Sequence, residues 1–380
     1  MLRIGKTYLK RADGSTRLCA DLTIGDRRTT LWFGVNSDQE EYLAPGRADP
    51  FVMAMLPSAM RKGHEIVCED PMSERLHHQL VNGLIPTLAF AGKLYQPVKI
   101  TAPLTAEKLP NQGAVGTGFS GGADCLYTIM KHGADCEFPL THIAIFHSRA
   151  VYDKPGFVEM CRLGDRFAQE LGLKRVYLDT NLSQILSFER YGNVYTFRNL
   201  ACALALQGLF SVYLISSGHS VSRLKINLEN VSQYDPLTVN CASTESITFY
   251  LSGGETTRVK KLETLADWEP SWRWLHPCIR VLPGGPNCGW CKKCSRDQTA
   301  LYAFGALDRY RSVFDVDDYL CNLPRHIEFL LSFEDSQTSG NTLQILKERN
   351  IPIPDEAFLH AKQIQIQRIR KQLAAKSKKP

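Results

Sequence analysis

Short apolar runs alternate with longer amphipathic segments through the middle of the chain. Four apolar runs predict strands, at 114–119, 141–146, 175–178 and 211–216. The intervening amphipathic segments predict helices, at 123–131, 156–171 and 193–208. Strands that alternate with helices of this length indicate βαβ units. The sequence therefore predicts an α/β fold with a parallel sheet and flanking helices, in which ligands bind at the carboxyl ends of the strands.

The first hundred residues carry a shorter pattern. Apolar residues at positions 18, 20, 22 and 24 alternate with polar ones, Gly25-Asp26 can form a tight turn, and apolar character resumes at 30–33. Alternation on both sides of a turn predicts a β-hairpin. Ser73 is placed to cap a helix over 75–84. We therefore expect a β-rich accessory domain at 1–108 that recognises a substrate or a partner.

Two further changes of pattern suggest the remaining domain boundaries. The polar stretch 105–112 contains Pro110 and is typical of a linker. From 297 onward the pattern is mostly helical, with breaks at prolines 324, 352 and 354. We expect an α/β catalytic domain at 109–310, with the cysteine-rich segment 278–294 inside it. A helical C-terminal extension at 311–380 then ends in a basic tail.

Composition excludes few classes of function. The chain has 380 residues and a formal net charge of +6, part of it in the tail from Lys362 to Lys379. A solvated tail and a nucleic-acid contact both stay open there. No apolar run approaches the roughly 20 residues of a membrane span, and no signal-peptide pattern is visible. We expect a cytoplasmic protein without membrane partners, whose twelve cysteines form no disulfides.

The segment FSGGADC at 119–125 has the composition of an anion-binding loop between a strand and a helix. The N–H groups at a helix N-terminus attract anions. Gly121 and Gly122 let the backbone approach a phosphate closely, and Ser120 can donate its hydroxyl. Asp124 can hold Mg²⁺, which accompanies polyphosphates. A tight turn that merely needs small residues is the alternative.

Four cysteines are spaced for a closed metal site. They follow the pattern C-x9-C-x2-C-x2-C, as Cys278, Cys288, Cys291 and Cys294. Gly289 allows a tight turn between the second and the third. Thiolates at this spacing wrap a tetrahedral Zn²⁺ and leave no coordination position open. We expect a structural zinc that stabilises a loop-rich segment, with an Fe–S cluster as the alternative.

The loop and the cysteine cluster together resemble one family. Ser-Gly-Gly-x-Asp followed by a small hydroxyl residue is the PP-loop of the ATP pyrophosphatases, which adenylate a carbonyl or carboxylate and release pyrophosphate. With the four cysteines, residues 113–310 are similar to the 7-cyano-7-deazaguanine synthases of the queuosine pathway. Three basic positions add to the resemblance: Arg198-Asn199 in YTFRNLACALAL, Thr257-Arg258, and Arg296 just after the last cysteine.

The resemblance implies an enzyme that activates the carboxylate of 7-carboxy-7-deazaguanine with ATP. Members of the family form an acyl-adenylate, make an amide with ammonia, and dehydrate it to the nitrile after a second activation. Ser120, Asp124 and Arg198 would then be the catalytic residues, with Arg198 near phosphate or substrate. ATP and Mg²⁺ would be bound by the loop residues Phe119, Ser120, Gly121, Gly122, Asp124 and Cys125.

The sequence departs from the family pattern within the expected core. Cys125 stands where the family usually has Ser, and the second predicted strand ends Phe-His-Ser-Arg at 146–149 in place of an Asp-Tyr-Gly-Gln type sequence. The segment 216–220 also diverges. We interpret Cys125 as a tolerated replacement. Its alternative is a reactive nucleophile, because a helix N-terminus lowers the pKa of a thiol.

Extra segments on both sides of the core indicate a redirected reaction. Divergent relatives with such extensions occur in bacterial anti-phage gene clusters, and this sequence resembles those. An acyl-adenylate reacts with any positioned amine, so we expect a protein N-terminus or a lysine as acceptor. Release of the free nitrile after reaction with ammonia, tRNA modification, and nucleotide binding without turnover are the alternatives. A homodimer stays open.

Overall fold

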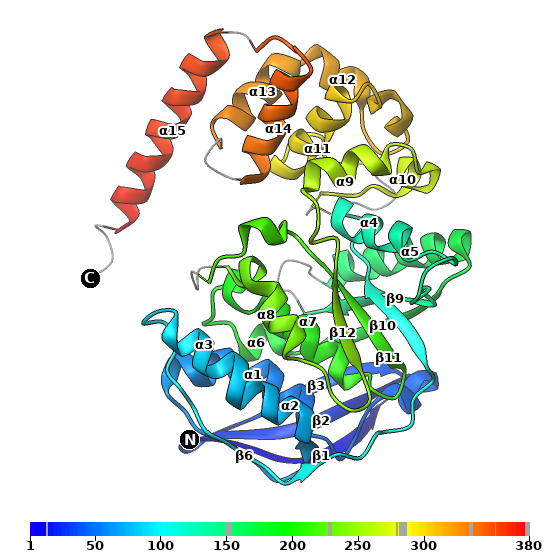
Figure 1. Ribbon diagram of the computed structural model, residues 1–380, viewed down its shortest axis with the longest axis vertical. Helices are drawn as coiled ribbons and strands as arrows, with labels where there is room; N and C mark the ends of the chain where they lie inside the picture. The colour runs from blue at the N-terminus through cyan, green and yellow to red at the C-terminus, as the bar shows by residue number, and fades with distance from the viewer. Residues whose placement is uncertain are drawn as a thin grey trace. The chain divides into compact units, whose positions relative to one another are not determined.

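The computed structural model describes residues 1–12, 14–148, 154–226, 230–278, 280, 287–333, 337–353 and 355–376 (Figure 1). Its contacts divide into two compact units. The sheet unit comprises Met1–Phe119 and Lys131–Glu255, and the helical unit comprises Ser120–Met130 and Thr256–Pro380. The chain thus leaves the sheet unit directly after Phe119 and returns to it at Lys131.

A ten-stranded sheet forms the centre of the sheet unit. In sheet order its strands are β12 (Thr248–Ser252), β11 (Phe210–Ser216), β8 (Ala114–Gly118), β9 (His142–His147), β10 (Lys174–Thr180), β3 (Arg27–Asn36), β2 (Ser15–Ile24), β1 (Leu2–Ala12), β4 (Ile66–Cys68) and β6 (Ile100–Thr101). Neighbours from β12 to β10 are parallel, neighbours from β10 to β1 are antiparallel, and β1, β4 and β6 are parallel. The predicted α/β class, with a mostly parallel sheet and flanking helices, is confirmed.

Crossover helices connect the parallel strands. The helix α5 (Lys154–Leu171) joins β9 to β10, and α6 (Leu182–Ile185) and α7 (Tyr191–Ala205) join β10 to β11. Most residues of α7 are buried, and it packs along α1 (Asp49–Lys62), which is also buried over most of its length. Further short elements include β5 (Met72–Ser73), β7 (Leu104–Thr105), α2 (Glu74–Gln79), α3 (Ile85–Phe90) and α8 (Asp235–Asn240).

The N-terminal strands continue the same sheet. The predicted hairpin is confirmed as β2 and β3, and β3 pairs with β10 through Gly34 and Phe33. The side chain of Asn181 strengthens this junction, because it accepts the N–H of Trp32 at 3.0 Å and donates to the carbonyl of Thr30 at 2.7 Å. By contact, the first 108 residues belong to the sheet unit, and the domain boundaries expected at 108 and 310 stay a prediction.

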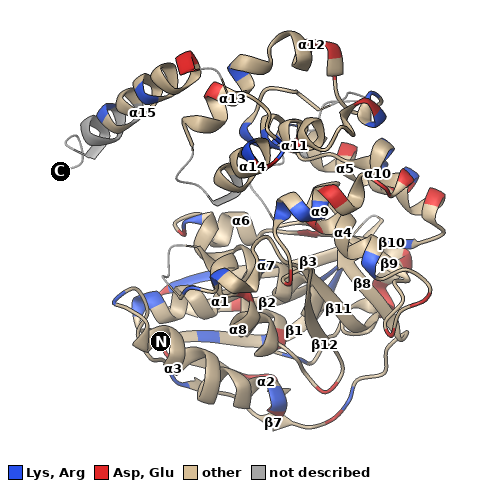
Figure 2. Cartoon of the chain, turned by 45° about the horizontal axis from the view of Figure 1, so that its top comes forward, with Lys and Arg blue, Asp and Glu red and all other residues tan. Residues whose placement is uncertain are grey.

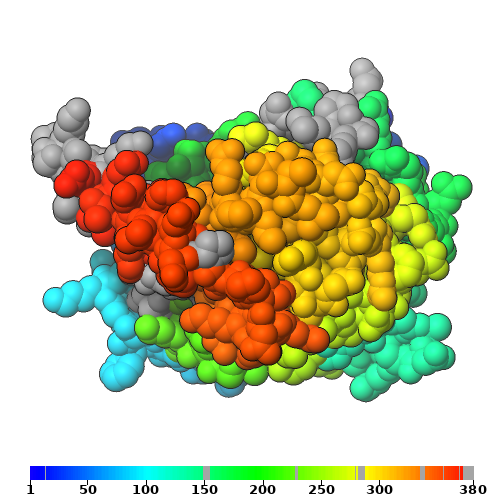
Figure 3. Space-filling view, turned by 90° about the horizontal axis from the view of Figure 1, so that it is seen from above, coloured from blue at the N-terminus to red at the C-terminus, as the bar shows by residue number. Residues whose placement is uncertain are grey.

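The helical unit takes its first helix from the middle of the sheet unit's sequence. It contains most of α4 (Ala123–Lys131), and further helices follow at α9 (Arg258–Leu265), α10 (Glu269–Trp274), α11 (Lys292–Ala303), α12 (Val316–Cys321), α13 (Leu323–Leu331), α14 (Gln337–Glu348) and α15 (Asp355–Lys376). Figure 3 looks onto the closely packed surface of the C-terminal helices, coloured yellow to red. None of the described helices combines the length and the apolar character that crossing a bilayer requires.

Candidate functional site

Tight packing explains some of the small residues in the loop at 119–125, which we call the small-residue loop. Gly121 has a φ of +66°, a left-handed conformation that favours glycine. A Cβ atom at this position would lie 2.7 Å from the Cβ atom of His276. The N–H of His276 also donates to the carbonyl of Gly121 at 2.7 Å. Gly121 is therefore required by its own backbone and by its neighbour, whereas Gly122 has room for a side chain.

The side chain of Cys125 forms hydrogen bonds with the backbone of the small-residue loop. The backbone N–H of Ser120 donates to its Sγ atom at 3.5 Å, and the thiol donates to the carbonyl of Gly122 at 3.2 Å. Burial raises the pKa of the Cys125 thiol. The lowered pKa that we considered for a reactive Cys125 is therefore wrong. The protonated thiol makes the loop contacts that a serine hydroxyl could make.

Asp124 is ionised and paired with two cations. Its Oδ2 atom contacts Nη1 of Arg258, and its Oδ1 atom lies 3.2 Å from Nζ of Lys261. Burial by itself raises the pKa of Asp124, but the charges of Arg258 and Lys261 outweigh it and hold the pKa below the ordinary value. Both carboxylate oxygens are engaged, so a Mg²⁺ ion at Asp124 would have to displace a cation.

A second buried carboxylate completes the cluster. Asp297 is fully buried and accepts from Nη2 of Arg258 and from Nε of Arg296, each at 2.9 Å. Burial raises its pKa, but the two arginines override this and hold the pKa low. We call Asp124, Arg258, Lys261, Arg296 and Asp297 the charge cluster.

The charge cluster contains a buried donor that no described acceptor meets. It contains three cations, Arg258, Lys261 and Arg296, against two carboxylates. Arg296 is 6% exposed, and its Nη2 atom is buried without a hydrogen-bond partner among the described residues. Burial lowers the pKa of Arg296, as expected for a desolvated cation. A buried donor of this kind is costly unless an acceptor meets it, so the cluster is suited to an anion.

The helix α9 supplies two of the three cations. Figure 2 marks its basic residues in blue. Thr257 caps this helix by accepting the N–H of Lys260 at 3.4 Å, which sets the start of the helix beside Arg258. The Thr257-Arg258 pair and Arg296 were noticed in the sequence. Lys261 and Asp297 were missed, and only their closeness to those residues in the sequence could have suggested them.

Two predicted residues belong to the sheet unit. Phe119 is buried and stacks on Phe167, with ring centres 4.5 Å apart. Arg198 is 3% exposed and donates to the carbonyls of Ser148 at 2.8 Å and Leu186 at 3.3 Å. Its guanidinium therefore holds the ends of two connecting segments together within the sheet unit.

The four predicted metal ligands converge. The Sγ atoms of Cys278, Cys288, Cys291 and Cys294 all lie within 4.8 Å of one another. The Cys288–Cys294 and Cys291–Cys294 sulfur distances are 3.8 Å and 3.4 Å. A tetrahedral Zn²⁺ with Zn–S bonds of about 2.3 Å separates its sulfurs by about 3.8 Å. The cluster can hold a metal ion such as zinc.

Backbone donors and a buried amide shape the cysteine cluster. The N–H of Cys291 donates to Sγ of Cys288 at 3.4 Å, and the N–H of Cys294 donates to Sγ of Cys291 at 3.5 Å. The Oδ1 atom of Asn287 accepts the N–H of Cys278 at 3.2 Å, and its amide donates to the carbonyls of Leu275 and Val313. Asn287 was missed in the sequence. Residues 279 and 281–286 of this segment lie outside the described residues.

One imidazole–carboxylate pair was also missed. His147 ends β9 and Asp179 stands opposite it on β10, with 2.7 Å between Nδ1 and Oδ1. The pair sits at the carboxyl ends of two parallel strands, where ligands bind in sheets of this class. His147 was noticed only as a departure from a family pattern, and Arg149 of the same stretch lies outside the described residues.

Comparison of the chain with protein-family models and with curated proteins finds no match.

Proposed function

We propose that the chain is an ATP-dependent, adenylate-forming C–N ligase that activates the carboxylate of a 7-deazaguanine such as 7-carboxy-7-deazaguanine. We further propose that it works in the cytoplasm, in anti-phage defence, with an amine of a partner protein as acceptor. The proposed substrate is inferred from the resemblance of residues 113–310 to the 7-cyano-7-deazaguanine synthases.

The observation that carries the proposal is the buried Nη2 atom of Arg296, which has no acceptor among the described residues and belongs to the charge cluster around Asp124. Asp124 is the second residue of α4, so the charge cluster lies at the N-terminus of that helix. A helix N-terminus and a buried guanidinium donor without a described acceptor both favour an anion. The pyrophosphate that leaves ATP during adenylation is such an anion, and fixed donors that meet its growing charge lower the barrier.

The proposed reaction has two steps. A carboxylate oxygen of the base attacks the α-phosphorus of ATP, and the bond to the pyrophosphate oxygen breaks. The acceptor amine then attacks the carbonyl carbon of the acyl-adenylate, AMP leaves, and the amine loses a proton. In this scheme Ser120 donates to a phosphate oxygen, and Asp124 positions Arg258 and Lys261. Arg296 donates to the pyrophosphate leaving group.

The two expected metals would have different roles. Zinc in the cysteine cluster is structural, because four thiolates leave no coordination position for a substrate. Mg²⁺ would enter on the polyphosphate of ATP, since Asp124 is already paired with Arg258 and Lys261. Arg198 is proposed as a positioning residue, because its guanidinium donates to the backbone carbonyls of Ser148 and Leu186 in its own unit.

Mass spectrometry of one reaction tests the proposal. The protein is incubated with ATP, Mg²⁺ and 7-carboxy-7-deazaguanine, with and without ammonia, and AMP and the base are followed. AMP with a free amide or nitrile indicates ammonia as acceptor. Base-dependent AMP without a free product indicates a protein acceptor, which must gain the mass of the base. The absence of base-dependent AMP contradicts the deazaguanine substrate, and RNA that gains the base would favour the tRNA alternative.

A further inference from the structure

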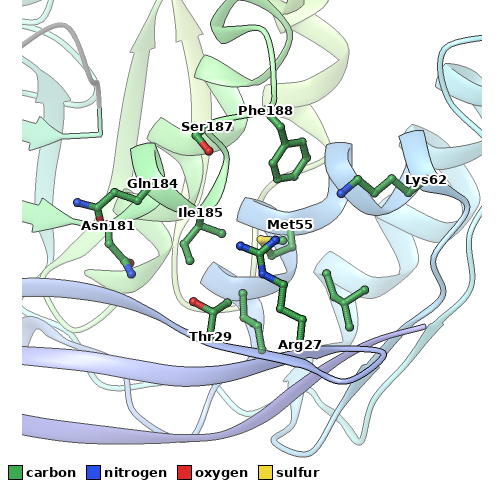
Figure 4. Close-up of a pocket in the computed structure, with 11 residues that line it drawn as sticks. Arg27, Thr29, Met55, Lys62, Asn181, Gln184, Ile185, Ser187 and Phe188 are labelled. Atoms are coloured by element: carbon green, nitrogen blue, oxygen red, sulfur yellow. The ribbon is translucent and has the colours of Figure 1, made fainter.

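A pocket of about 520 Å³ opens within the sheet unit (Figure 4). Three segments form its walls: the β2–β3 hairpin, the helix α1, and residues 181–188 after β10. Its volume lies in the range of roughly 300–1,000 Å³ that is typical of small-molecule sites. The pocket adjoins the carboxyl end of β10, the edge at which such sheets bind ligands.

The hairpin places apolar and polar side chains side by side in this pocket. Leu22 pairs with Thr29 across the two strands, and Ile24 pairs with Arg27. Directly opposed residues point to the same face of a sheet, so all four side chains face the pocket. Met55 of α1 adds a buried apolar surface. Leu22, Ile24 and Met55 thus give the pocket an apolar lining, and Arg27 adds a cation beside them.

The rim is cationic. Arg27 and Lys62 are both exposed, and no described carboxylate forms an ion pair with either of them. No described acidic residue lines the pocket. The Nζ atom of Lys62 lies 3.9 Å from the centre of the Phe188 ring. Figure 4 shows Lys62 pointing from α1 toward Phe188, and Arg27 rising from the hairpin toward Met55.

The segment that carries Phe188 is anchored at both ends, yet the Phe188 ring stays accessible. Asn181 ties the start of the segment to β3 through two hydrogen bonds. At the other end, Arg61 of α1 pairs with Glu189 at 3.1 Å, and the Glu189 side chain is only 2% exposed. Phe188 between them is nevertheless 46% exposed. An exposed aromatic ring on an anchored segment, beside cations that form no ion pair with a described carboxylate, is typical of a binding surface.

We propose that this pocket binds a small anion with a flat apolar body, an aromatic or heteroaromatic carboxylate or phosphate ester. Arg27 and Lys62 take the anionic group, Phe188 stacks on the ring, and Leu22, Ile24 and Met55 support it from below. The site lies wholly within the sheet unit, so it does not depend on the proposed adenylation at the loop.

Binding of naphthalene probes to the full chain, without ATP, tests the site. Isothermal titration is carried out with 2-naphthoate, 2-naphthyl phosphate, 2-naphthalenemethanol and acetate. We expect saturable binding of one or both aromatic anions, at least about tenfold tighter than binding of the alcohol, and none of acetate, because both the charge and the ring contribute. The tighter of the two anions identifies the anionic group.

Matched variants locate the binding. Arg27→Gln, Lys62→Gln and Phe188→Leu are each expected to weaken the better anion by about fivefold or more, the effect of one exposed charge or ring. Arg28→Gln is the control, since Arg28 pairs with Thr23 and therefore faces the other side of the hairpin. Circular dichroism checks the fold of each variant. No saturable binding, an equally tight alcohol, or unchanged affinity in the Arg27 and Lys62 variants would overturn the proposal.

Discussion

Arg258 bridges Asp124 and Asp297, its Nη1 atom on the first carboxylate and its Nη2 atom on the second. Asp124 lies 134 positions before Arg258 in the chain, and Asp297 lies 39 positions after it. One buried guanidinium thus links the start of α4 to α9 and α11. The small-residue loop is held by this ionic network as well as by its own turn.

Removal of one carboxylate should destabilise the protein strongly. Asp297→Asn leaves Arg258 and Arg296 with a neutral partner in a buried place, and we expect a loss of about 3–5 kcal/mol in the free energy of unfolding. Urea denaturation followed by circular dichroism measures it. The control is Asp267→Asn, because the side chain of Asp267 is 86% exposed in its pair with Arg309 and should matter little. Equal stabilities for the two variants would contradict the network.

The contacts of Cys125 predict how it can be replaced. Cys125→Ser keeps an acceptor for the Ser120 N–H, whereas Cys125→Ala leaves that donor unpaired and should cost about 1–3 kcal/mol. Thermal unfolding of the two variants compares their stabilities.

Because burial raises the pKa of the Cys125 thiol, iodoacetamide at neutral pH should modify the exposed Cys321 and spare Cys125. Peptide mapping that finds Cys125 alkylated first would argue for a reactive nucleophile.

Local patterns predicted the elements well where the physics is local. The hairpin of β2 and β3, the Ser73 cap of α2 and the strands β8 to β11 all appear, with boundaries that move by a few residues. The short strand β6 begins at Ile100, after Pro97, which has no N–H to give to a ladder.

Pairings between segments far apart in the chain could not be predicted from the sequence. Nothing in the alternation of 30–33 indicates that β3 would pair with β10, since strand partners depend on the packing of the whole sheet. The same holds for the charge cluster, where the motif identified Asp124 but gave no sign that Arg258 and Lys261 would neutralise it. The cysteines were predictable because their spacing alone brings three of the thiols together.

Metal content tests the cysteine cluster. We expect about one zinc per chain in the purified protein by elemental analysis, and loss of that zinc in Cys291→Ser. Cys321→Ser lies outside the cluster and should keep its metal. Chelation should lower the melting temperature of the wild type and leave Cys291→Ser almost unchanged. Full zinc content in Cys291→Ser would contradict a four-thiolate site, and iron in place of zinc would favour the Fe–S alternative.

Asp235 should make stability fall as the pH rises through the acidic range. Burial raises its pKa to about 7, and only the hydroxyl of Thr196, 2.7 Å away, opposes this. Between about pH 4 and 7 the folded chain therefore holds a proton that the unfolded chain has lost. This contribution to stability is complete below pH 4 and disappears above 7.

Asp235→Asn removes that proton exchange. The free energy of unfolding of the variant should rise relative to that of the wild type as the pH rises from 4 to 7, by on the order of 1.4 kcal/mol per unit of pKa shift. Urea denaturation at four pH values between 4 and 8 gives the two curves. Parallel curves for wild type and variant would show that Asp235 titrates normally in the folded protein.

Exchange of labelled pyrophosphate into ATP tests the proposed adenylation of the deazaguanine directly. The assay reports adenylate formation alone and needs no acceptor amine. We predict exchange that requires 7-carboxy-7-deazaguanine, and a fall of about 100-fold in Arg296→Gln, which lacks the buried donor for the leaving group. Absence of base-dependent exchange in the folded, zinc-loaded wild type would contradict adenylation of a deazaguanine carboxylate.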